Sequence, residues 1–397
     1  MMRASLIIFS LLLPGFSFAG SAAIDYQQQV LELPSGKVNV RVPVGMQLEL
    51  LTDDMSSPRL LTFIGNELLA GSRSGNVYRL SPPYTRVEVF ADTGGYPHNV
   101  AFRDSTLFIA TTEGLYRVPY KTGQAAIDVS SLKLVARIPG GGGHNSRTVA
   151  VGPDKRLYLS LGITGNCSDE YLGKSYDFTD RRGGVMVLDE TTKPASWKTF
   201  ASGLRNPVGF DWHPDTGVMY ASNNGPDHLG FDLPPEYFSR LEQDTFMGMP
   251  WYQYDGKSLT RDDCIGASSP RPASEVTLPV ATFPARNAPM GVSFVPGHGL
   301  DKRLAGDAIV AMKGSWGTKP SGSFFGDPAT RRDPKLVVVR FEDGKAQRVD
   351  DLVTGFQLED GSRWARPVGV AIGPDGALYF TSDSGVNGLF RLRKIIK

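Results

Sequence analysis

The feature that most constrains the fold of this chain is a repeated unit of a short apolar strand, a tight turn and a second strand. Residues 205–223 can be laid over residues 366–383, because both contain Pro-Val-Gly before the first strand and a Pro-Asp turn after it. A unit of this kind buries its faces only against its neighbours, so the repeat determines the architecture. Further copies begin near Arg59, His98, Ser146 and Pro289. These six units predict an all-β fold, a closed six-bladed β-propeller.

The length and composition of the chain fit one large folded domain. The repeats extend from about residue 50 to the end of the 397-residue chain, which is 41% hydrophobic and 21% charged and can bury a sizeable core. The 45 glycines and 28 prolines are typical of a fold with a turn every few residues. We expect a single propeller domain over residues 20–397.

The first 19 residues have the pattern of a secretory signal peptide. Arg3 precedes an apolar run from Leu6 to Leu13, and small residues end at Ala19, although cleavage as late as residue 23 fits equally. The run is too short to span a bilayer, and no later segment resembles a membrane span. Removing residues 1–19 takes away one of 42 basic residues and leaves 41 against 41 acidic ones, so no net charge favours nucleic-acid binding. We expect a soluble periplasmic or secreted protein.

Cys167 and Cys264 are the only cysteines in the chain. An even count of two favours one disulfide in an oxidising compartment, and such a disulfide would close a long loop. Two unpaired loop cysteines are the alternative, because a sequence carries no information on their geometry. The sequence contains neither a Cys-x-x-Cys-His haem motif nor a zinc-binding spacing.

Polar side chains stand just before or at the start of the expected inner strands. In a propeller these strands surround a central channel, so residues at the same end of each strand converge on one small region. A ring that combines imidazole with several guanidinium groups suits a ligand with several negative charges. The alternative is that these positions are simply polar strand starts at a solvated channel mouth. The candidates are Arg59, His98, His144 with Ser146 and Arg147, Arg205 with Asn206, Asn287, and Arg366.

His144 is the histidine best placed for chemistry. Four glycines, 140–143, precede it and leave room for other groups to approach closely. A neutral imidazole in that position can act as a general base. His98 also starts an inner strand, where a structural role is equally expected.

The other three histidines have less favourable positions. His213 and His298 lie in turn sequences, which predicts surface positions. His228 follows Asn-Gly-Pro-Asp and is expected near a site without belonging to it.

Two inserts between blades, residues 164–182 and 231–282, are the longest and are expected to shape the rim of the site. The second insert contains Trp251, Tyr252 and Tyr254. Aromatic clusters usually belong to a core, so we expect packing, with a platform for a sugar ring as the alternative.

Four motifs follow one another along the chain: His144–Gly162, Gly203–Gly209, Ala311–Trp316 and Ala365–Ala371. In this order they resemble the glucose/sorbosone dehydrogenase family, exported six-bladed propellers typified by soluble aldose dehydrogenases that use pyrroloquinoline quinone (PQQ). The resemblance extends over about residues 40–393. Gly-Pro-Asp-Gly turns alone occur in many propellers, whereas the ordered set of motifs is specific.

This resemblance implies roles for individual residues. His144 matches the family histidine that takes the hydroxyl proton of the sugar while hydride passes to the quinone. Arg205 matches the arginine beside the quinone oxygens, where positive charge stabilises developing negative charge. Asn206 matches a cofactor-contacting asparagine, and Lys313 and Arg366 match cations that pair with the PQQ carboxylates.

The resemblance also implies calcium and shows three departures. Gly225 and Pro226 match the segment whose backbone carbonyls hold calcium against PQQ. Gly143 stands where soluble glucose dehydrogenases have an aspartate, and Asn224 replaces a glutamine or glutamate of the calcium segment. Val368 stands where a second arginine would follow Arg366. These departures imply weaker PQQ binding than in the best-known relatives, and the substrate does not transfer.

We therefore expect an exported PQQ-dependent dehydrogenase that oxidises an aldose, or a related sugar aldehyde, and passes electrons to an external acceptor. One alternative is a calcium-dependent lactonase or hydrolase on the same kind of propeller, and another is a non-catalytic propeller that binds an acidic ligand. Such a hydrolase usually places several side-chain carboxylates on its metal, whereas the strand starts here are mainly cationic. Absorbance of added PQQ, with and without calcium, separates the first function from the others.

Overall fold

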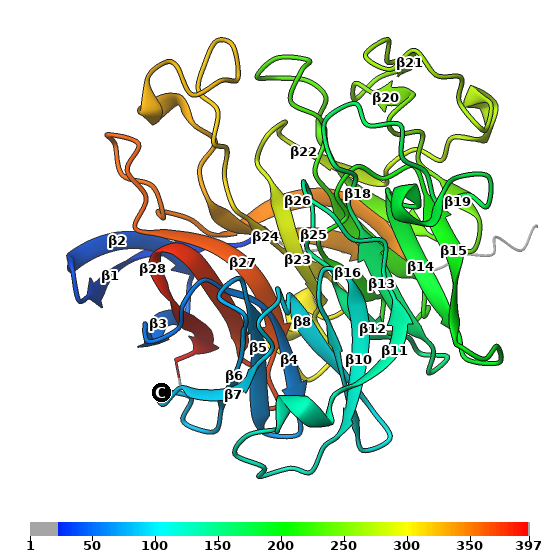
Figure 1. The fold of residues 1–397 in the computed structure, drawn as a ribbon. Helices are drawn as coiled ribbons and strands as arrows, with labels where there is room; N and C mark the ends of the chain where they lie inside the picture. Colours follow the sequence, from blue (N-terminus) through cyan, green and yellow to red (C-terminus); the bar gives the residue numbers. More distant parts are fainter. Residues whose placement is uncertain (1–22, 396–397) are drawn as a thin grey trace, which may run out of the picture.

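A computed structural model describes residues 23–395, and the regular secondary structure of this part is almost wholly β-strand (Figure 1). The expected signal peptide, residues 1–19, lies outside the described residues. None of the helices within residues 23–395 is long and apolar enough to cross a membrane. The helices of this part are 3-10 turns: η1 (Val129–Ser131), η2 (Phe178–Asp180), η3 (Ala273–Glu275), η4 (Lys302–Leu304) and η5 (Pro328–Thr330).

Six sheets stand around a central axis and confirm the predicted six-bladed β-propeller (Figure 1). Given from the inner strand outwards, the first two blades are β4 (Pro58–Ile64), β5 (Glu67–Ser72), β6 (Asn76–Leu80) and β7 (Glu88–Asp92), then β8 (Asn99–Arg103), β9 (Thr106–Ala110), β10 (Gly114–Pro119) and β11 (Lys133–Arg137). The third blade is β12 (Val149–Val151), β13 (Leu157–Leu161), β14 (Gly184–Asp189), β15 (Ser196–Ser202) and the parallel β19 (Thr245–Phe246). The fourth and fifth are β16 (Phe210–Trp212), β17 (Met219–Asn223), β18 (Glu236–Leu241) and β22 (Ala281–Phe283), then β23 (Pro289–Phe294), β24 (Ala308–Met312), β25 (Lys335–Glu342) and β26 (Lys345–Val353).

The sixth blade joins the two ends of the domain. It contains β27 (Ala365–Ile372), the long β28 (Leu378–Lys394) and β3 (Met46–Thr52). The first part of β28 pairs with β27, and its last part pairs antiparallel with β3. A strand from the beginning of the domain thus completes the blade made by its end, which closes the ring.

Two hairpins lie outside the blades. One is formed by β1 (Tyr26–Leu33) and β2 (Gly36–Pro43), and the other by β20 (Tyr252–Tyr254) and β21 (Leu259–Arg261). The first hairpin is attached to the fifth blade, because the main-chain groups of Arg41 and Thr354 form a two-way bridge with distances of 3.0 and 3.1 Å.

The repeated Pro-x-Gly sequence has a packing cause. Gly209 directly precedes β16, and Gly291 and Gly369 lie on β23 and β27, each against the main chain of the next blade. A Cβ on Gly209 would lie 2.3 Å from the carbonyl oxygen of Met290, and a Cβ on Gly369 would lie 2.4 Å from that of Arg59. Only glycine allows the inner strands to approach this closely, so the motif marks blade-to-blade contact.

Buried polar side chains also connect neighbouring blades. The amide of Asn99 donates to the carbonyl of Val149 at 2.8 Å and accepts from its N–H at 2.9 Å. The hydroxyl of Thr381 donates to the carbonyl of Arg59 at 2.6 Å, between the last blade and the first. These bonds satisfy groups that would otherwise be costly to bury.

Three expectations about side-chain positions had different outcomes. The prediction that His213 lies at the surface is wrong, because the ring is 3% exposed and packs against Phe294 and Phe341 with centroids 5.2 and 5.3 Å away. Its turn folds back onto the next blade, a contact that turn chemistry alone does not reveal. Trp251 is fully buried and packs against Tyr171, which confirms packing for this member of the aromatic cluster. His298 is exposed, as expected.

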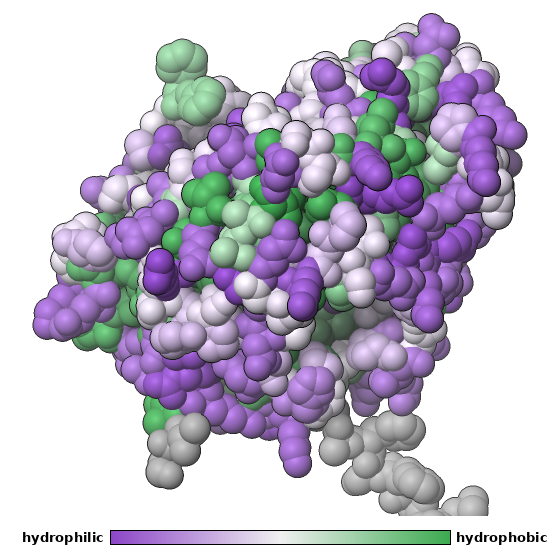
Figure 2. Space-filling model, turned by 60° about the horizontal axis from the view of Figure 1, so that its bottom comes forward, coloured by the Kyte–Doolittle hydropathy of each residue, from purple (hydrophilic) through white to green (hydrophobic). Residues whose placement is uncertain are grey.

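The outer surface and the centre of the molecule differ in character. The face in Figure 2 is mostly hydrophilic, with hydrophobic residues coming to the surface between hydrophilic ones. At the centre, the inner strands line a channel of about 320 Å³. The candidates at strand starts lie just before or at the beginning of these inner strands, and Lys313 follows the antiparallel β24, so they gather at one end of the channel.

Candidate active site

His144 is held by main-chain groups in a loop between β11 and β12. Its Nδ1 lies 2.5 Å from the carbonyl oxygen of Ile163, so Nδ1 carries the proton and donates. The N–H of Ile163 in turn donates to the carbonyl of Arg205 at 2.8 Å. Burial, then the positive charge of Arg205, lowers the pKa of His144 from 6.5 to about 4. The imidazole is therefore neutral at ordinary pH, with the lone pair of Nε2 available to accept a proton.

Two buried arginines shape this loop from behind. Arg147 donates to the carbonyls of His144 and Pro139 at 3.0 and 2.9 Å. Arg182 donates to the carbonyls of His144 and Gly142 at 3.1 and 3.0 Å. Arg147, a candidate because of its place at a strand start, therefore stabilises the loop that holds His144. Arg182 was not among the candidates because it lies in the 164–182 insert.

Asn206 lies beside His144. A Cβ on Gly162 would meet the Cβ of His144 at 2.5 Å and the Oδ1 of Asn206 at 2.7 Å, so a glycine is needed between the two side chains. The main-chain N–H of Asn206 donates to the side-chain oxygen of Asn223 at 3.0 Å. The motif spacing therefore brought these two predicted residues together as expected.

Arg205 is 5% exposed and is fixed by two residues that sequence reasoning missed. Its Nη2 donates to Oδ1 of Asn166 at 2.5 Å and lies 3.4 Å from Oδ2 of Asp227. The other oxygen of Asp227 accepts from Arg286 at 2.6 Å. Asp227 directly follows the predicted calcium segment, which was the available signal, whereas Asn166 and Arg286 come from separate loops.

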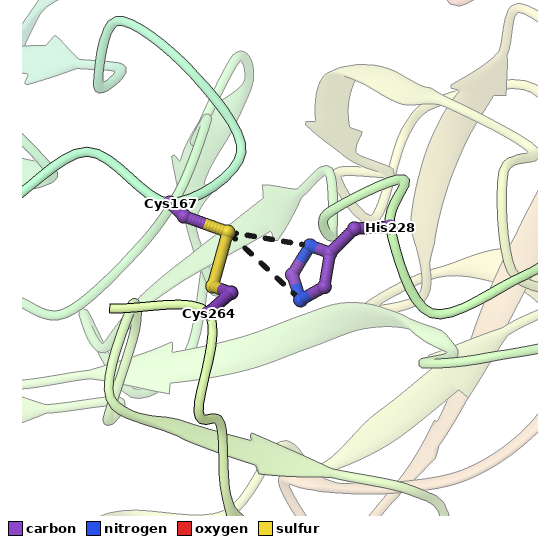
Figure 3. A group of neighbouring side chains, drawn as sticks. All are labelled: Cys167, His228 and Cys264. Atoms are coloured by element: carbon purple, nitrogen blue, oxygen red, sulfur yellow. Dashed lines mark hydrogen bonds between the residues drawn. A yellow bond between two sulfur atoms is a disulfide. The ribbon is translucent and has the colours of Figure 1, made fainter. Parts of the chain in front are cut away.

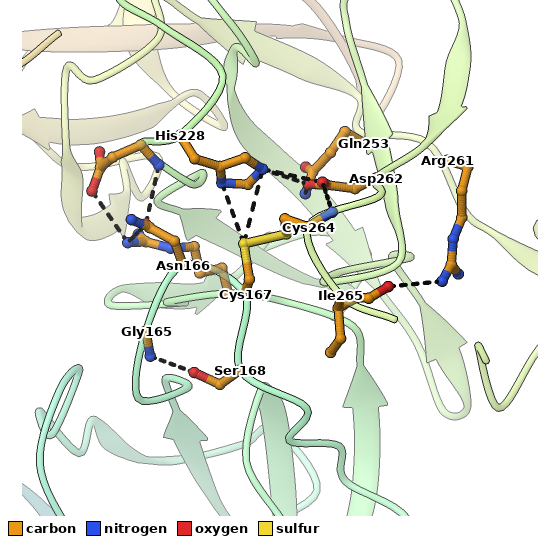
Figure 4. Close-up of a disulfide and its surroundings, with 12 residues drawn as sticks. Gly165, Asn166, Cys167, Ser168, His228, Gln253, Arg261, Asp262, Cys264 and Ile265 are labelled. Atoms are coloured by element: carbon orange, nitrogen blue, oxygen red, sulfur yellow. Dashed lines mark hydrogen bonds and ion pairs between the residues drawn. A yellow bond between two sulfur atoms is a disulfide. The ribbon is translucent and has the colours of Figure 1, made fainter. Parts of the chain in front are cut away.

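A disulfide stands behind Asn166. Cys167 and Cys264 are bonded, with Cα atoms 5.8 Å apart, which confirms the expected pairing (Figure 3). The ring of His228 lies against this bond, with Nδ1 3.5 Å from Sγ of Cys167 and Nε2 3.0 Å from Oδ2 of Asp262 (Figure 4). Bonded sulfurs are not thiolates, so these three side chains do not form a metal centre in this state. His228 is near the site without facing the predicted ligand ring, as expected.

The side chains around Arg205 and His144 form one group, and a second group of cations lies around Asp383. This second group consists of Lys313, Arg59 and Arg366, and Asp383 itself was not singled out from the sequence. Oδ2 of Asp383 accepts from Nζ of Lys313 at 2.6 Å and from Nη1 of Arg59 at 2.5 Å. Arg366 donates to the carbonyls of Lys313 and Gly314, each at 2.9 Å. Burial, then the charge of Arg59, lowers the pKa of Lys313 from 10.5 to about 7, against the opposing effect of Asp383.

His98 lies between the two groups and is fully buried. The hydroxyl of Thr148 donates to the carbonyl of Val208 at 2.5 Å, so Nδ1 of His98 donates to that hydroxyl at 3.0 Å. Burial, then the charges of Arg59 and Arg147, holds the pKa of His98 well below its usual range. Because Arg59 belongs to the second group and Arg147 to the His144 loop, the two groups lie at the same end of the channel.

Of the remaining strand-start candidates, Asn287 has a structural contact. Its side-chain amide donates to the carbonyl of Asp333 at 3.0 Å and so anchors the loop before β25. The two cationic groups are nevertheless joined through this segment, because the N–H of Gly314 donates to the carbonyl of Asn287 at 2.9 Å and the neighbouring Arg286 pairs with Asp227.

The segment predicted to hold calcium runs between β17 and β18. The N–H of Gly225 donates to Oε2 of Glu236, and the amide of Asn224 donates to the carbonyl of Pro289 at 2.5 Å. Burial raises the pKa of Glu236 to about 7. Within residues 23–395 the carbonyls of Gly225 and Pro226 accept no hydrogen bond, and oxygen donors of this kind are what calcium prefers.

The polar atoms left without partners test whether PQQ fits this site. Nε of Arg59, Nε of Arg205, Nε2 of His98 and Oδ1 of Asp383 are buried and have no hydrogen-bond partner among the described residues. Such atoms are costly unless a ligand or water contacts them. The two arginine Nε–H groups and the Lys313 ammonium are donors that fit the carboxylates of a flat cofactor, whereas Nε2 of His98 and Oδ1 of Asp383 are acceptors.

Two of the sequence departures have a structural reason. Gly143 has φ of +70°, and a Cβ there would lie 2.0 Å from the carbonyl oxygen of Thr164, so an aspartate does not fit this loop. Val368 is fully buried on β27, where an arginine side chain would have no room. The packing around Gly143 and Val368 therefore has no room for the aspartate and the arginine that the relatives have at these positions.

The fold and this site define a class: a six-bladed propeller whose channel mouth combines a neutral histidine with several cations. Residues 40–234 match the family model described as TrAA12-like. This match, which covers just under half of the chain, confirms the suspected resemblance to PQQ-dependent sugar dehydrogenases.

Individual proteins are similar to most of the chain. A protein of Borreliella burgdorferi described only as uncharacterized is 25% identical over 368 residues, which cover 89% of this chain and 90% of that protein. The iodide structure of the AA12-family enzyme of Trichoderma reesei has a TM-score of 0.73 at 18% identity and covers 89% of this chain and 97% of that one. The calcium structure of that enzyme gives 0.72 at 18% identity, with 95% and 100% covered. The holo PQQ domain of pyranose dehydrogenase from Coprinopsis cinerea gives 0.72 at 17% identity, with 90% and 97% covered. At these identities the structural likenesses show the fold.

Proposed function

We propose that this protein is an exported PQQ-dependent dehydrogenase that oxidises an aldose, or a related sugar aldehyde, with His144 as general base. The observation that carries the proposal is a neutral imidazole, fixed through Nδ1, beside a cluster of buried cations with unpartnered donors. The family match and the PQQ domain and calcium form among the fold neighbours support the choice of cofactors.

The cationic residues would hold the cofactor. PQQ, when bound, supplies an acceptor for two electrons, which no side chain of the protein provides. Lys313 and Arg366 would pair with its carboxylates, Asn206 would contact it by hydrogen bonds, and Arg205 would face its quinone oxygens. Asp383 keeps the charges of Lys313 and Arg59 together before the cofactor enters.

His144 would take the proton of the reacting hydroxyl group. Its Nδ1–H stays with the carbonyl of Ile163, so the proton arrives at Nε2. The same hydrogen bond stabilises the imidazolium that forms, because the carbonyl oxygen faces its positive charge. The charge of Arg205 opposes protonation of His144. The same charge would stabilise negative charge that develops on the oxygens of the bound cofactor as it accepts electrons from the substrate.

Gly225 and Pro226 would hold calcium through their carbonyl oxygens. Calcium, when bound, supplies Lewis-acid polarisation of the oxygens that it contacts. Asp227 adds negative charge near this segment, although Arg205 and Arg286 already neutralise much of it. Glu236 adds negative charge only when it is deprotonated, because burial raises its pKa to about 7.

We further propose that residues 1–19 direct export and are removed, with cleavage as late as residue 23, and that residues 20–397 act as one domain. The mature protein would work in the periplasm or outside the cell and pass electrons to an external acceptor. The disulfide supports an oxidising compartment.

Reconstitution tests the proposed function. Purified protein loaded with PQQ and calcium should reduce an artificial dye when aldoses are added, with no reduction when either PQQ or sugar is omitted. If PQQ binds tightly but no sugar in a broad panel gives dye reduction, the protein is a binding module. Hydrolysis of lactones or esters with calcium alone would instead assign it to the hydrolases.

A further inference from the structure

A second concave region lies on the side of the propeller, between the outer strands of the second and third blades. It is a groove of about 940 Å³ that shares no lining residue with the candidate active site. One wall is residues 134–137 of β11, and the other is formed by β14 and by residues 196–199 of β15, while residues of the 172–181 loop close one end. We call it the β11–β15 groove. The indole of Trp197 joins its walls by donating to the carbonyl of Arg137 at 2.9 Å.

The groove is lined mainly by hydrophobic residues, some of them well exposed. Leu134 is 49% exposed and Phe178 is 42% exposed, although both face a concave region. Val135, Ala195 and Trp197 are only partly buried, resting on the core between the two blades. Hydrophobic side chains gathered in a concavity of this size are typical of a binding site.

The charged residues that line the groove itself are all basic. Its lining contains five basic residues and no acidic one: Arg137, Arg156, Lys174, Arg181 and Lys198. Arg156 and Lys198 are neutralised by Asp154 and Asp189, each at 2.6 Å.

The other three basic residues of the lining have no acidic partner within residues 23–395. Arg137, Lys174 and Arg181 form no ion pair with a carboxylate anywhere in residues 23–395. Arg181 donates only to main-chain carbonyls: its Nε lies 2.8 Å from the carbonyl oxygen of Tyr176, and its Nη2 lies 3.2 Å from the carbonyl oxygen of Lys174. The groove therefore combines a long hydrophobic surface with unneutralised positive charge.

We propose that the β11–β15 groove binds a single-chain anionic amphiphile, such as a long-chain carboxylate. Its hydrocarbon chain would lie along Leu134, Phe178 and Trp197, and its head group would lie among Arg137 and Lys174. Because Arg137 and Lys174 are exposed, an anionic head group would gain charge-assisted contacts with them, while a hydrocarbon chain would cover the hydrophobic walls. A ligand with both parts therefore matches the groove better than a neutral lipid or a small anion. This site is independent of the proposed dehydrogenase function.

Tryptophan quenching tests the proposal directly. A brominated long-chain carboxylate, added below the concentration at which it forms micelles, should quench the fluorescence of the full-length protein saturably. The Trp197→Phe variant should lose most of this quenching, because Trp197 lies in the groove. The matched control Trp316→Phe should keep it, because Trp316 is an exposed indole outside the groove.

Charge and shape variants complete the test. The double variant Arg137→Gln/Lys174→Gln should bind the probe about 10- to 100-fold more weakly, as expected for lost hydrogen bonds to charged groups. Leu134→Glu should weaken it as well, and because Leu134 is half exposed the variant should melt like the wild type. Unchanged affinity in both variants, non-saturable quenching, or quenching that survives in Trp197→Phe would overturn the proposal. Equal binding of a brominated alcohol, or displacement only by an acidic peptide, would likewise overturn it.

Discussion

The imidazole Nδ1 of His144 donates to the carbonyl oxygen of Ile163 at 2.5 Å, and Ile163 also donates its N–H to the carbonyl of Arg205. Ile163, two residues after the end of β13, therefore sets the tautomer of His144 and also binds the main chain at Arg205. This relationship makes His144, rather than His98, the base in our account, since the ring of His98 is fully buried beside Thr148.

Replacing His144 by Ala should lower turnover by about a hundredfold to ten-thousandfold, the usual contribution of a positioned general base. PQQ affinity should stay nearly unchanged, because His144 acts on the substrate proton. Steady-state kinetics at saturating PQQ, with a separate PQQ titration, measures both quantities.

His98→Ala is the matched control for that variant. Loss of a fully buried ring and of its hydrogen bond to Thr148 should lower the melting temperature instead. If His98→Ala abolished turnover in a folded protein while His144→Ala remained active, the assignment of the base would be wrong.

The low pKa of His144 predicts an unusual acid limit for activity. The folded protein binds the proton of this group only near pH 4, whereas an ordinary histidine binds it near 6.5. kcat/KM should therefore stay high as the pH falls through 6.5 and should decline only towards about 4. In the same window the unfolded chain takes up the proton first, so the stability contributed by neutral His144 is lost as the pH falls from 6.5 to 4. A kcat/KM profile with an acid limb near 6.5 would contradict this.

The depressed pKa of Lys313 predicts proton uptake when PQQ binds. Apo-protein loses the ammonium proton as the pH rises through about 7, while the cofactor carboxylates favour the charged form. PQQ affinity should therefore fall above pH 7, with proton uptake visible by calorimetry in buffers of different ionisation enthalpy. Lys313→Arg should bind PQQ without that pH dependence, because arginine stays charged. Proton release on binding to the wild type would count against the role of Lys313.

The disulfide should stabilise the protein and position Arg205. Cys167 and Cys264 are 97 residues apart, so the chain-entropy model gives about 4–5 kcal/mol of stabilisation for their bond. The Cys167→Ser/Cys264→Ser variant should unfold at lower denaturant concentration and should show lower kcat, because Asn166 next to Cys167 holds Arg205. Alkylation of two free thiols in the exported wild type would contradict the bond itself.

The fold could be predicted from the sequence because packing between blades requires the repeated motif. Gly209, Gly291 and Gly369 recur at equal places because each inner strand touches the next one, so the motif could be recognised without coordinates. His144 could be found for a similar reason, since a run of glycines precedes it.

The partners of these residues could not be found in the same way. Asp383 and Asn166 come from other blades or inserts, and only the closed ring brings them to Lys313 and Arg205. The burial of His213 was missed for the same reason, because it depends on the facing rings of Phe294 and Phe341 from the next blade. Contacts that recur in every repeat unit leave a sequence pattern, whereas contacts made only once between distant segments need the assembled propeller.

The most direct test of the account is an equilibrium titration of PQQ into the purified apo-protein with calcium, followed by the absorbance of the cofactor. We expect saturable binding to the wild type, and we expect Arg366→Ala to weaken it by about 2–5 kcal/mol, the cost of removing one partner of a buried charge pair. Absence of saturable binding to the wild type, or unchanged affinity in Arg366→Ala, would contradict the assignment of this channel mouth as a PQQ site.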